Sequence, residues 1–175
     1  MNYISHRGNI SGRNPKKENH PDYIKAAINE GYEVEVDIWY NNNQYCLGHN
    51  KPLYPIKKEF LRKYSCSTLL HCKDIKTYKT FYNNSIGNSF FFSDKDAITV
   101  LLENFCDIRG SSLIQCFTSS VLLDYSICMM PEESGWYFNR QYSSPSNEKR
   151  AIKKALSVCA AVCTDNINYY KGLLR

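Results

Sequence analysis

Residues 32–40 form the stretch that most constrains the fold of this chain. Valine or isoleucine stands at positions 34, 36 and 38, and glutamate or aspartate stands at positions 33, 35 and 37. Because successive side chains of a strand point to opposite faces, this alternation predicts a β-strand with one apolar and one acidic face. Glu35 and Asp37 therefore share a face, and the surroundings of that face decide what they do.

Segments of strand type alternate with segments of helical type along the rest of the chain. Strands are predicted at residues 3–5, 32–40, 44–47, 68–72, 89–92, 112–117, 126–129 and 160–163, and helices at residues 22–30, 56–63, 74–83 and 148–156. Residues 94–105 fit either class. The alternation predicts an α/β fold with parallel pairing, and 175 residues suit a single domain spanning residues 1–175.

Polar residues stand at or just after the ends of several predicted strands. They include His6, Asp37, His71, Lys73 and Asp165. In an α/β barrel the carboxyl ends of all the strands open on one face, where active sites lie. We therefore expect these residues, although far apart in sequence, to gather in one site.

The charge and the apolar runs limit the classes of partner. A formal net charge of +5 suits an anionic substrate, or loose attraction to nucleic acid. The basic residues form scattered pairs rather than one stripe interleaved with aromatic residues, so nucleic-acid binding is disfavoured. No apolar stretch approaches the roughly 18 residues of a membrane span, so none is expected.

The eight cysteines would suit a secreted disulfide framework, but the sequence favours free thiols in a reducing cytoplasm. No signal peptide precedes the first apolar run. A chain of this length can also build a core without disulfides. Several cysteines, such as Cys72 and Cys116, lie in apolar runs, where a free cysteine packs as a small hydrophobe.

Glu35 and Asp37 are candidate metal ligands. If their face is the interior of a barrel, two unpaired carboxylates are costly to bury, and a divalent cation would offset that cost. Hard oxygen ligands suit Mg²⁺ or Ca²⁺. The alternative is the solvated outer face of an edge strand, which would suit Glu33 on the same face equally well.

His6, Arg7 and Gly8 form a second candidate group at the end of the first apolar run. Glycine lets the backbone approach a ligand closely, and arginine forks onto phosphate oxygens. The alternative is a capped turn with an exposed arginine. His49 follows the predicted hairpin and is by itself typical of a solvated loop, and His20 is assigned no chemistry.

The order of these groups resembles the glycerophosphodiester phosphodiesterase family and the related phospholipase D toxins of spider venom. The matching stretches are Ile4-Ser5-His6-Arg7-Gly8, Glu18-Asn19, residues 31–37, Leu47-Gly48-His49-Asn50 and Ala161-Val162-Cys163-Thr164-Asp165-Asn166. The ordered set is specific, although each stretch alone is not.

This resemblance implies a TIM-type (β/α) barrel and metal-dependent cleavage of a phosphodiester. It also implies roles for individual residues: acid/base catalysis by His6 and His49, metal binding by Glu35 and Asp37, phosphate contact by Arg7, and ordering of the surrounding loop by Glu18.

One departure from the family concerns the third metal ligand, which is an acidic residue followed two positions later by lysine. Lys73 fits that lysine, but His71 stands at the acidic position. Imidazole is a poorer ligand for Mg²⁺ than for Zn²⁺ or Mn²⁺. One alternative is that the site prefers another metal than the family does, and a second is that Asp94 or Glu132 supplies the missing oxygen ligand. A third is that the site binds metal weakly, and a fourth is that His71 is simply a buried core histidine.

A second departure is length, because an eight-stranded barrel usually takes about 250 residues. A compact barrel with trimmed helices and loops, or with a strand and helix lost, is therefore expected. Residues 92–136 do not resemble the family, which leaves the substrate least defined.

The sequence thus predicts a hydrolase acting on a small glycerophosphodiester-like substrate, with two-histidine catalysis that is fastest near neutral pH. Its cofactor is expected to be a divalent cation, Mg²⁺ or Ca²⁺, with Mn²⁺ or Zn²⁺ open because of His71. The alternative is a catalytically degraded barrel that binds a phosphorylated ligand. The oligomeric state is left open.

Overall fold

The fold is mixed α/β, as predicted, in a computed structural model that describes residues 2–84, 89–93, 98–100, 113–115, 124, 126–130 and 145–174. Its strands are β1 (Asn2–His6), β2 (Glu33–Asn41), β3 (Gln44–Leu47), β4 (Tyr54–Ile56), β5 (Thr68–Cys72), β6 (Ser89–Phe92), β7 (Ile98–Val100), β8 (Leu113–Gln115), β9 (Ile127–Met129) and β10 (Ala161–Thr164). Its helices are α1 (Pro21–Asn29), α2 (Lys58–Lys63), α3 (Ile75–Asn84), α4 (Pro145–Val158) and α5 (Ile167–Leu174), with a 3₁₀ turn at Ser65–Ser67.

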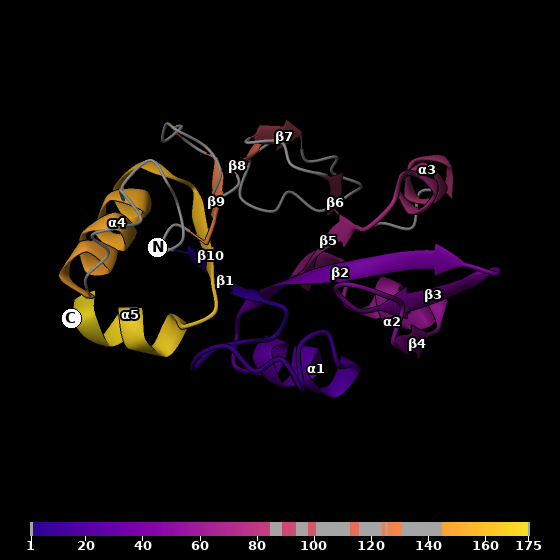
Figure 1. The fold of residues 1–175 in the computed structure, drawn as a ribbon, viewed down its shortest axis with the longest axis horizontal. Helices are drawn as coiled ribbons and strands as arrows, with labels where there is room; N and C mark the ends of the chain where they lie inside the picture. The colour runs from indigo at the N-terminus through magenta and orange to yellow at the C-terminus, as the bar shows by residue number, and fades with distance from the viewer. Residues whose placement is uncertain are drawn as a thin grey trace.

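The sheet is built mainly from parallel pairs (Figure 1). On one side of β1 the parallel pairs run β1–β2, β2–β5 and β5–β6, and on the other side they run β1–β10, β10–β9 and β9–β8. β7 pairs antiparallel with β8, and its residues come within 8 Å of β6, measured between Cα atoms. β3 and β4 add an antiparallel extension to the carboxyl-terminal half of β2.

The strands bury side chains on both faces, in two separate clusters. One cluster packs strand residues such as Val36 and Leu70 against helix residues such as Ile24 and Phe81. The other cluster contains strand residues: Ile4, Leu69, Phe91, Ile114, Ile127, Met129, Ala161 and Cys163. Since side chains of one face recur every second residue, the face that carries the second cluster also carries the predicted site residues at the strand ends.

Local chemistry accounts for the start of α1. Pro21 occupies the first turn, where no backbone donor is needed, and the His20 side chain accepts a hydrogen bond from the Asp22 N–H at 3.2 Å. His20 therefore caps a helix, in line with its exclusion from the chemistry. Gly31 follows the helix with a positive φ of 87°, a conformation that glycine adopts without strain.

Two differences from the predicted elements reflect tertiary pairing. The helix predicted at residues 56–63 begins at Lys58, because Tyr54 to Ile56 pair with β3 as strand β4. Helix α5 has no counterpart in the sequence prediction, and Tyr170 on it packs into the core between the strands and the helices. Most of the ambiguous stretch 94–105 lies outside the described residues, apart from β7.

The cysteines follow the predicted thiol chemistry only in part. Free thiols are found at Cys46, Cys72, Cys128, Cys159 and Cys163. Cys66, by contrast, is disulfide-bonded, which does not fit the expected all-thiol chain of a reducing compartment. Among the described residues no helix has the length and apolar character needed to cross a membrane.

Candidate functional site

The acidic face of β2 is buried rather than solvated. Glu35 is 1 % exposed and Asp37 is fully buried, which rules out the outer face of an edge strand for both residues. The parallel register sets Glu35 beside His6 of β1 and Asp37 beside His71 of β5. Three neighbouring strands therefore bring their polar side chains to one place, from the carboxyl ends of β1 and β5 and from the first five residues of β2.

His71 faces these carboxylates and forms a cluster with them. Its Nδ1 lies 3.2 Å from Asp37 Oδ1 and 3.6 Å from Glu35 Oε1. One ligand atom from each of the three residues lies within 4.8 Å of the others, so the trio could hold a metal ion. The two other oxygen donors considered from sequence, Asp94 and Glu132, lie outside the described residues.

The donor set of the cluster fits a divalent cation. Glu35 Oε2 is buried and accepts no hydrogen bond from the described residues, while the buried Asp37 Oδ1 is ion-paired with Lys73 Nζ at 3.1 Å and lies 3.2 Å from His71 Nδ1. Buried carboxylate oxygens of this kind are costly unless a positive charge compensates them. Two atoms that bind one ion at about 2.1 Å lie roughly 3.0–3.4 Å apart, close to the separations from His71 Nδ1.

Arg7 leaves β1 in a turn that the backbone fixes tightly. Its φ is 56°, its N–H donates to the Glu35 carbonyl at 2.9 Å, and its carbonyl accepts from the Asn19 N–H at 3.1 Å. Gly8 follows with a φ of 93°, and a Cβ there would come 2.7 Å from a ring carbon of Tyr23. The glycine therefore serves close packing of the turn.

The Arg7 guanidinium is buried among acidic groups, which rules out the exposed arginine considered from sequence. Nε lies 2.8 Å from Asp37 Oδ2, and Nη1 donates to Glu18 Oε2 at 3.2 Å. Nη2 lies 3.4 Å from His49 Nε2. Glu18 thus holds the guanidinium, a contact to which the resemblance did not point, since it implied for Glu18 the ordering of the surrounding loop.

His6 is held by a partner from the far end of the chain. Its Nδ1 lies 2.8 Å from Asp165 Oδ1, and its Nε2 lies 3.8 Å from Glu35 Oε2. Burial would lower the pKa of His6, but the hydrogen bond to Asp165 and the charge of Glu35 raise it above its ordinary value. The same histidine and Asn9 lower the pKa of Asp165 despite its burial.

His49 reaches the opposite carboxylate and is partly open to solvent, at 39 % side-chain exposure. Its Nδ1 lies 3.2 Å from Asp37 Oδ2, and Lys73 Nζ lies 3.5 Å from the same nitrogen. Lys73 Nζ also pairs with Asp37 Oδ1 at 3.1 Å. Arg7, Lys73 and His49 therefore gather around Asp37.

Asn19 and Asp165 contribute to the site more than the sequence prediction allowed. Asn19 Nδ2 donates to Asp37 Oδ2, and the Asp37 N–H donates to Asn19 Oδ1, both at 2.9 Å. Asn19 is fully buried and has a φ of 62°. For Asn19 the only sequence signal is its presence in a matching stretch, whereas Asp165 was also predicted at a strand end, with no specific role.

Asp37 is the most strongly perturbed carboxyl of the site. Burial alone would raise its pKa, but hydrogen bonds from His49 and His71 and the charges of Arg7 and Lys73 hold it well below its ordinary value. For His71, burial lowers the pKa, yet Asp37 and Glu35 together raise it to about 9. Asp37 is therefore an anion across the physiological pH range.

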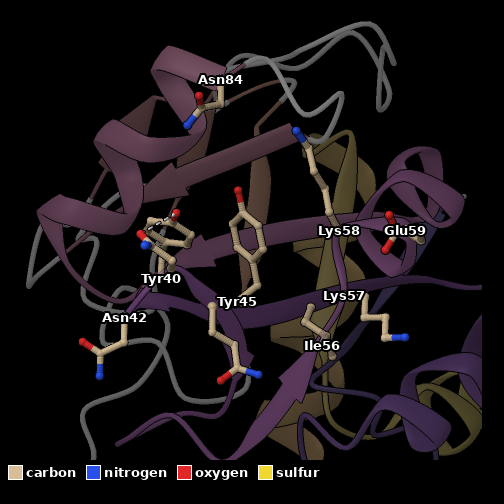
Figure 2. Close-up of a pocket in the computed structure, with 10 residues that line it drawn as sticks. Tyr40, Asn42, Tyr45, Ile56, Lys57, Lys58, Glu59 and Asn84 are labelled. Carbon is tan, nitrogen blue, oxygen red and sulfur yellow. Dashed lines mark hydrogen bonds between the residues drawn. The ribbon is translucent and has the colours of Figure 1, made fainter.

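A separate hollow of about 730 Å³ lies at the tip of the β2–β3 hairpin (Figure 2). Tyr40 and Tyr45 line it from the hairpin, and Lys57, Lys58 and Glu59 line it near the start of α2. It contains none of the residues predicted for catalysis, metal binding or substrate binding.

Comparison with protein-family models, with curated proteins and with solved structures gives no match.

Proposed function

We propose that this chain is a compact TIM-type barrel that hydrolyses a glycerophosphodiester-like substrate with the help of a divalent cation. The chain-ordered parallel pairs around β1 and the proximity of β7 to β6 support a closed ring of strands. The strand-only cluster would then be the layered barrel interior, and the polar cluster would occupy its carboxyl-terminal mouth.

The observation that carries the chemical part of the proposal is the pairing of the two histidines with the buried carboxylates. His6 adjoins Glu35, and His49 adjoins Asp37. In each histidine Nδ1 faces a carboxylate, Asp165 for His6 and Asp37 for His49. A carboxylate at Nδ1 fixes the ring and directs proton exchange with substrate to Nε2, which lies 3.4 Å from Arg7 Nη2 in His49 and 3.8 Å from Glu35 Oε2 in His6.

A cation held by Glu35, Asp37 and His71 would polarise the phosphate oxygens as a Lewis acid. Arg7 and Lys73 add positive charge beside Asp37, where charge develops on the phosphoryl group. One histidine takes a proton from the attacking water or substrate hydroxyl, and the other protonates the leaving alkoxide.

The test is hydrolysis of glycerophosphodiesters by the full chain, with released alcohol measured over time. We expect His6→Ala and His49→Ala each to abolish turnover while the circular-dichroism spectrum stays close to wild type. A chelator should abolish turnover as well. The variant His20→Ala, which removes a helix cap and an edge contact with the Tyr54 ring, should retain activity. Full activity in either active-site variant would refute the mechanism.

One observation favours a second candidate, a barrel that binds a phosphorylated ligand without cleaving it. Both oxygens of Asp37 already contact cationic side chains, Arg7 Nε at 2.8 Å and Lys73 Nζ at 3.1 Å. These cations stabilise Asp37 without a metal. Calorimetric binding of a phosphodiester with no turnover in Mg²⁺, Ca²⁺, Mn²⁺ or Zn²⁺ would establish this candidate instead.

A further inference from the structure

We infer that the site selects a transition-metal dication that accepts nitrogen, of the Zn²⁺ and Mn²⁺ class, over Mg²⁺ and Ca²⁺, and that His71 makes the selection. The inference rests on the metal site of the proposed function but not on hydrolysis. Four observations carry it: the placement of the His71 ring, its hydrogen bond, the chemistry of the three donors and the buried Glu35 carboxylate.

The His71 ring is fixed in its plane by its neighbours. The β5–β6 register places His71 beside Phe91, and the two rings stack with centroids 4.6 Å apart and planes 6° from parallel. The ring cannot turn away from β2 without losing this stacking. Its Nδ1 edge is therefore directed at Asp37 and Glu35.

The opposite edge of the ring determines which nitrogen is a donor. His71 Nε2 lies 3.3 Å from the Ser93 carbonyl oxygen. A carbonyl oxygen only accepts hydrogen bonds, so Nε2 carries a proton, and whenever the ring is neutral its lone pair is on Nδ1. A backbone carbonyl at the distal N–H is the usual support for a metal-bound histidine, because it fixes the tautomer and the ring orientation.

A lone pair that faces two buried carboxylates requires a positive species between them. Glu35 Oε2 is buried with no hydrogen bond from the described residues. The other oxygen of this carboxylate, Oε1, lies 3.6 Å from His71 Nδ1. Only two species fit between these donors, a proton on Nδ1 or a metal ion. The proton would satisfy Asp37 at 3.2 Å but would leave Glu35 with only the longer contacts to His71 at 3.6 Å and His6 at 3.8 Å, whereas an ion can bind Glu35, Asp37 and His71 together.

The identity of the ion follows from the three donors. Mg²⁺ and Ca²⁺ prefer all-oxygen surroundings, while imidazole suits Zn²⁺ and its transition-metal neighbours. Two carboxylates and one imidazole also leave coordination positions open for a phosphate oxygen or water, as catalytic metal sites do. A carboxylate at position 71 would supply the oxygen ligand that Mg²⁺ prefers.

The experiment measures the binding of Zn²⁺, Mn²⁺, Mg²⁺ and Ca²⁺ to the metal-free full chain by titration calorimetry without substrate. The variants are His71→Gln, His71→Glu and, as a matched histidine control, His20→Gln. Wild type and the control should bind Mn²⁺ and Zn²⁺ at least about tenfold tighter than Mg²⁺. Loss of an outer-shell partner alone costs about 10–100-fold in metal affinity, so His71→Gln, which removes a ligand, should lose at least that much for Mn²⁺ and Zn²⁺, and His71→Glu should shift the preference toward Mg²⁺.

Free thiols also bind Zn²⁺, so the test compares the Zn²⁺ affinity of wild type with that of His71→Gln, in which the thiols are unchanged. The absorption of bound Co²⁺ provides an independent measurement. The visible Co²⁺ bands should change in His71→Gln and not in His20→Gln. Equal binding by wild type and His71→Gln would overturn the inference, as would tighter binding of Mg²⁺ or Ca²⁺, or no binding of any ion. Selective binding without turnover would refute the proposed function alone, and turnover with an unselective site would refute only this inference.

Discussion

Asn19 provides the sharpest test of how Asp37 is held in place. It is fully buried, and its side chain exchanges two hydrogen bonds with Asp37, one to the backbone N–H and one to Oδ2. Its backbone is also in the left-handed region, with a φ of 62°. Replacement by glycine removes the hydrogen bonds and keeps the backbone relaxed, while replacement by alanine removes the bonds and adds strain.

The expected cost follows from what each group loses. The buried Asp37 N–H is left without this acceptor, which costs about 1–3 kcal/mol. Asp37 Oδ2 still contacts Arg7 and His49, so loss of the Asn19 donor adds only about 1 kcal/mol. Asn19→Gly should therefore destabilise the fold by about 2–4 kcal/mol, and Asn19→Ala by a further 1–2 kcal/mol or so from backbone strain.

The assay is urea unfolding followed by tryptophan fluorescence and circular dichroism, with melting temperature as a second measure. For a chain of this size the glycine variant should melt roughly 4–16 °C lower. Asn43 is the matched control, because it has a φ of 59° but is exposed at the hairpin tip. Asn43→Gly should stay close to wild type. An Asn19→Gly variant within about 0.5 kcal/mol of wild type would refute this account of Asp37.

Three further outcomes are expected. His6 lowers the pKa of Asp165, so the carboxylate contributes stability above its ordinary pKa and loses it as pH falls; denaturant titrations should show a steeper loss below about pH 4 in wild type than in Asp165→Asn. A thiol reagent should modify Cys159 before Cys72 in the folded protein, because a hydrogen bond with Cys128 lowers the pKa of Cys159 and burial raises the pKa of Cys72. Faster modification of Cys72 would contradict this assignment of the two thiol pKa shifts. A bound ion at about 100 times its Kd should raise the melting temperature by roughly 5–11 °C, reversibly with chelator, and an unchanged melting curve would argue against a metal site.

The sequence predicted the central strands well because their apolar periodicity is local. The prediction of residues 32–40 differs from β2 by one position at each end, and that of residues 44–47 coincides with β3. The alternation also placed Glu35 and Asp37 on one face correctly. Periodicity alone could not show whether that face is exposed to solvent or buried, because burial depends on strands that are distant in the chain.

The parts of the site that were underestimated depend on contacts between distant segments. Asn19 lies in a polar loop, and nothing local shows that its amide will meet β2. Asp165 was expected at a strand end, but its bond to His6 requires β10 to lie beside β1. Strand β4 was not predicted, and its last residue Ile56 was assigned to the following helix, because pairing with β3 is not encoded in a run of only three residues.

The pairing of β1 with β10 has a consequence for the order in which the protein forms. His6 and Asp165 are separated by 159 positions, yet they lie 2.8 Å apart. During synthesis His6 therefore has no partner for its Nδ1 until residue Asp165 has emerged. Closing so long a loop costs chain entropy before any contact offsets it, so the His6 side chain should be among the last groups to become ordered. In a nascent chain stalled before β10, Glu35 and His71 would already be present on β2 and β5, but His6 would lack the Asp165 contact that positions it.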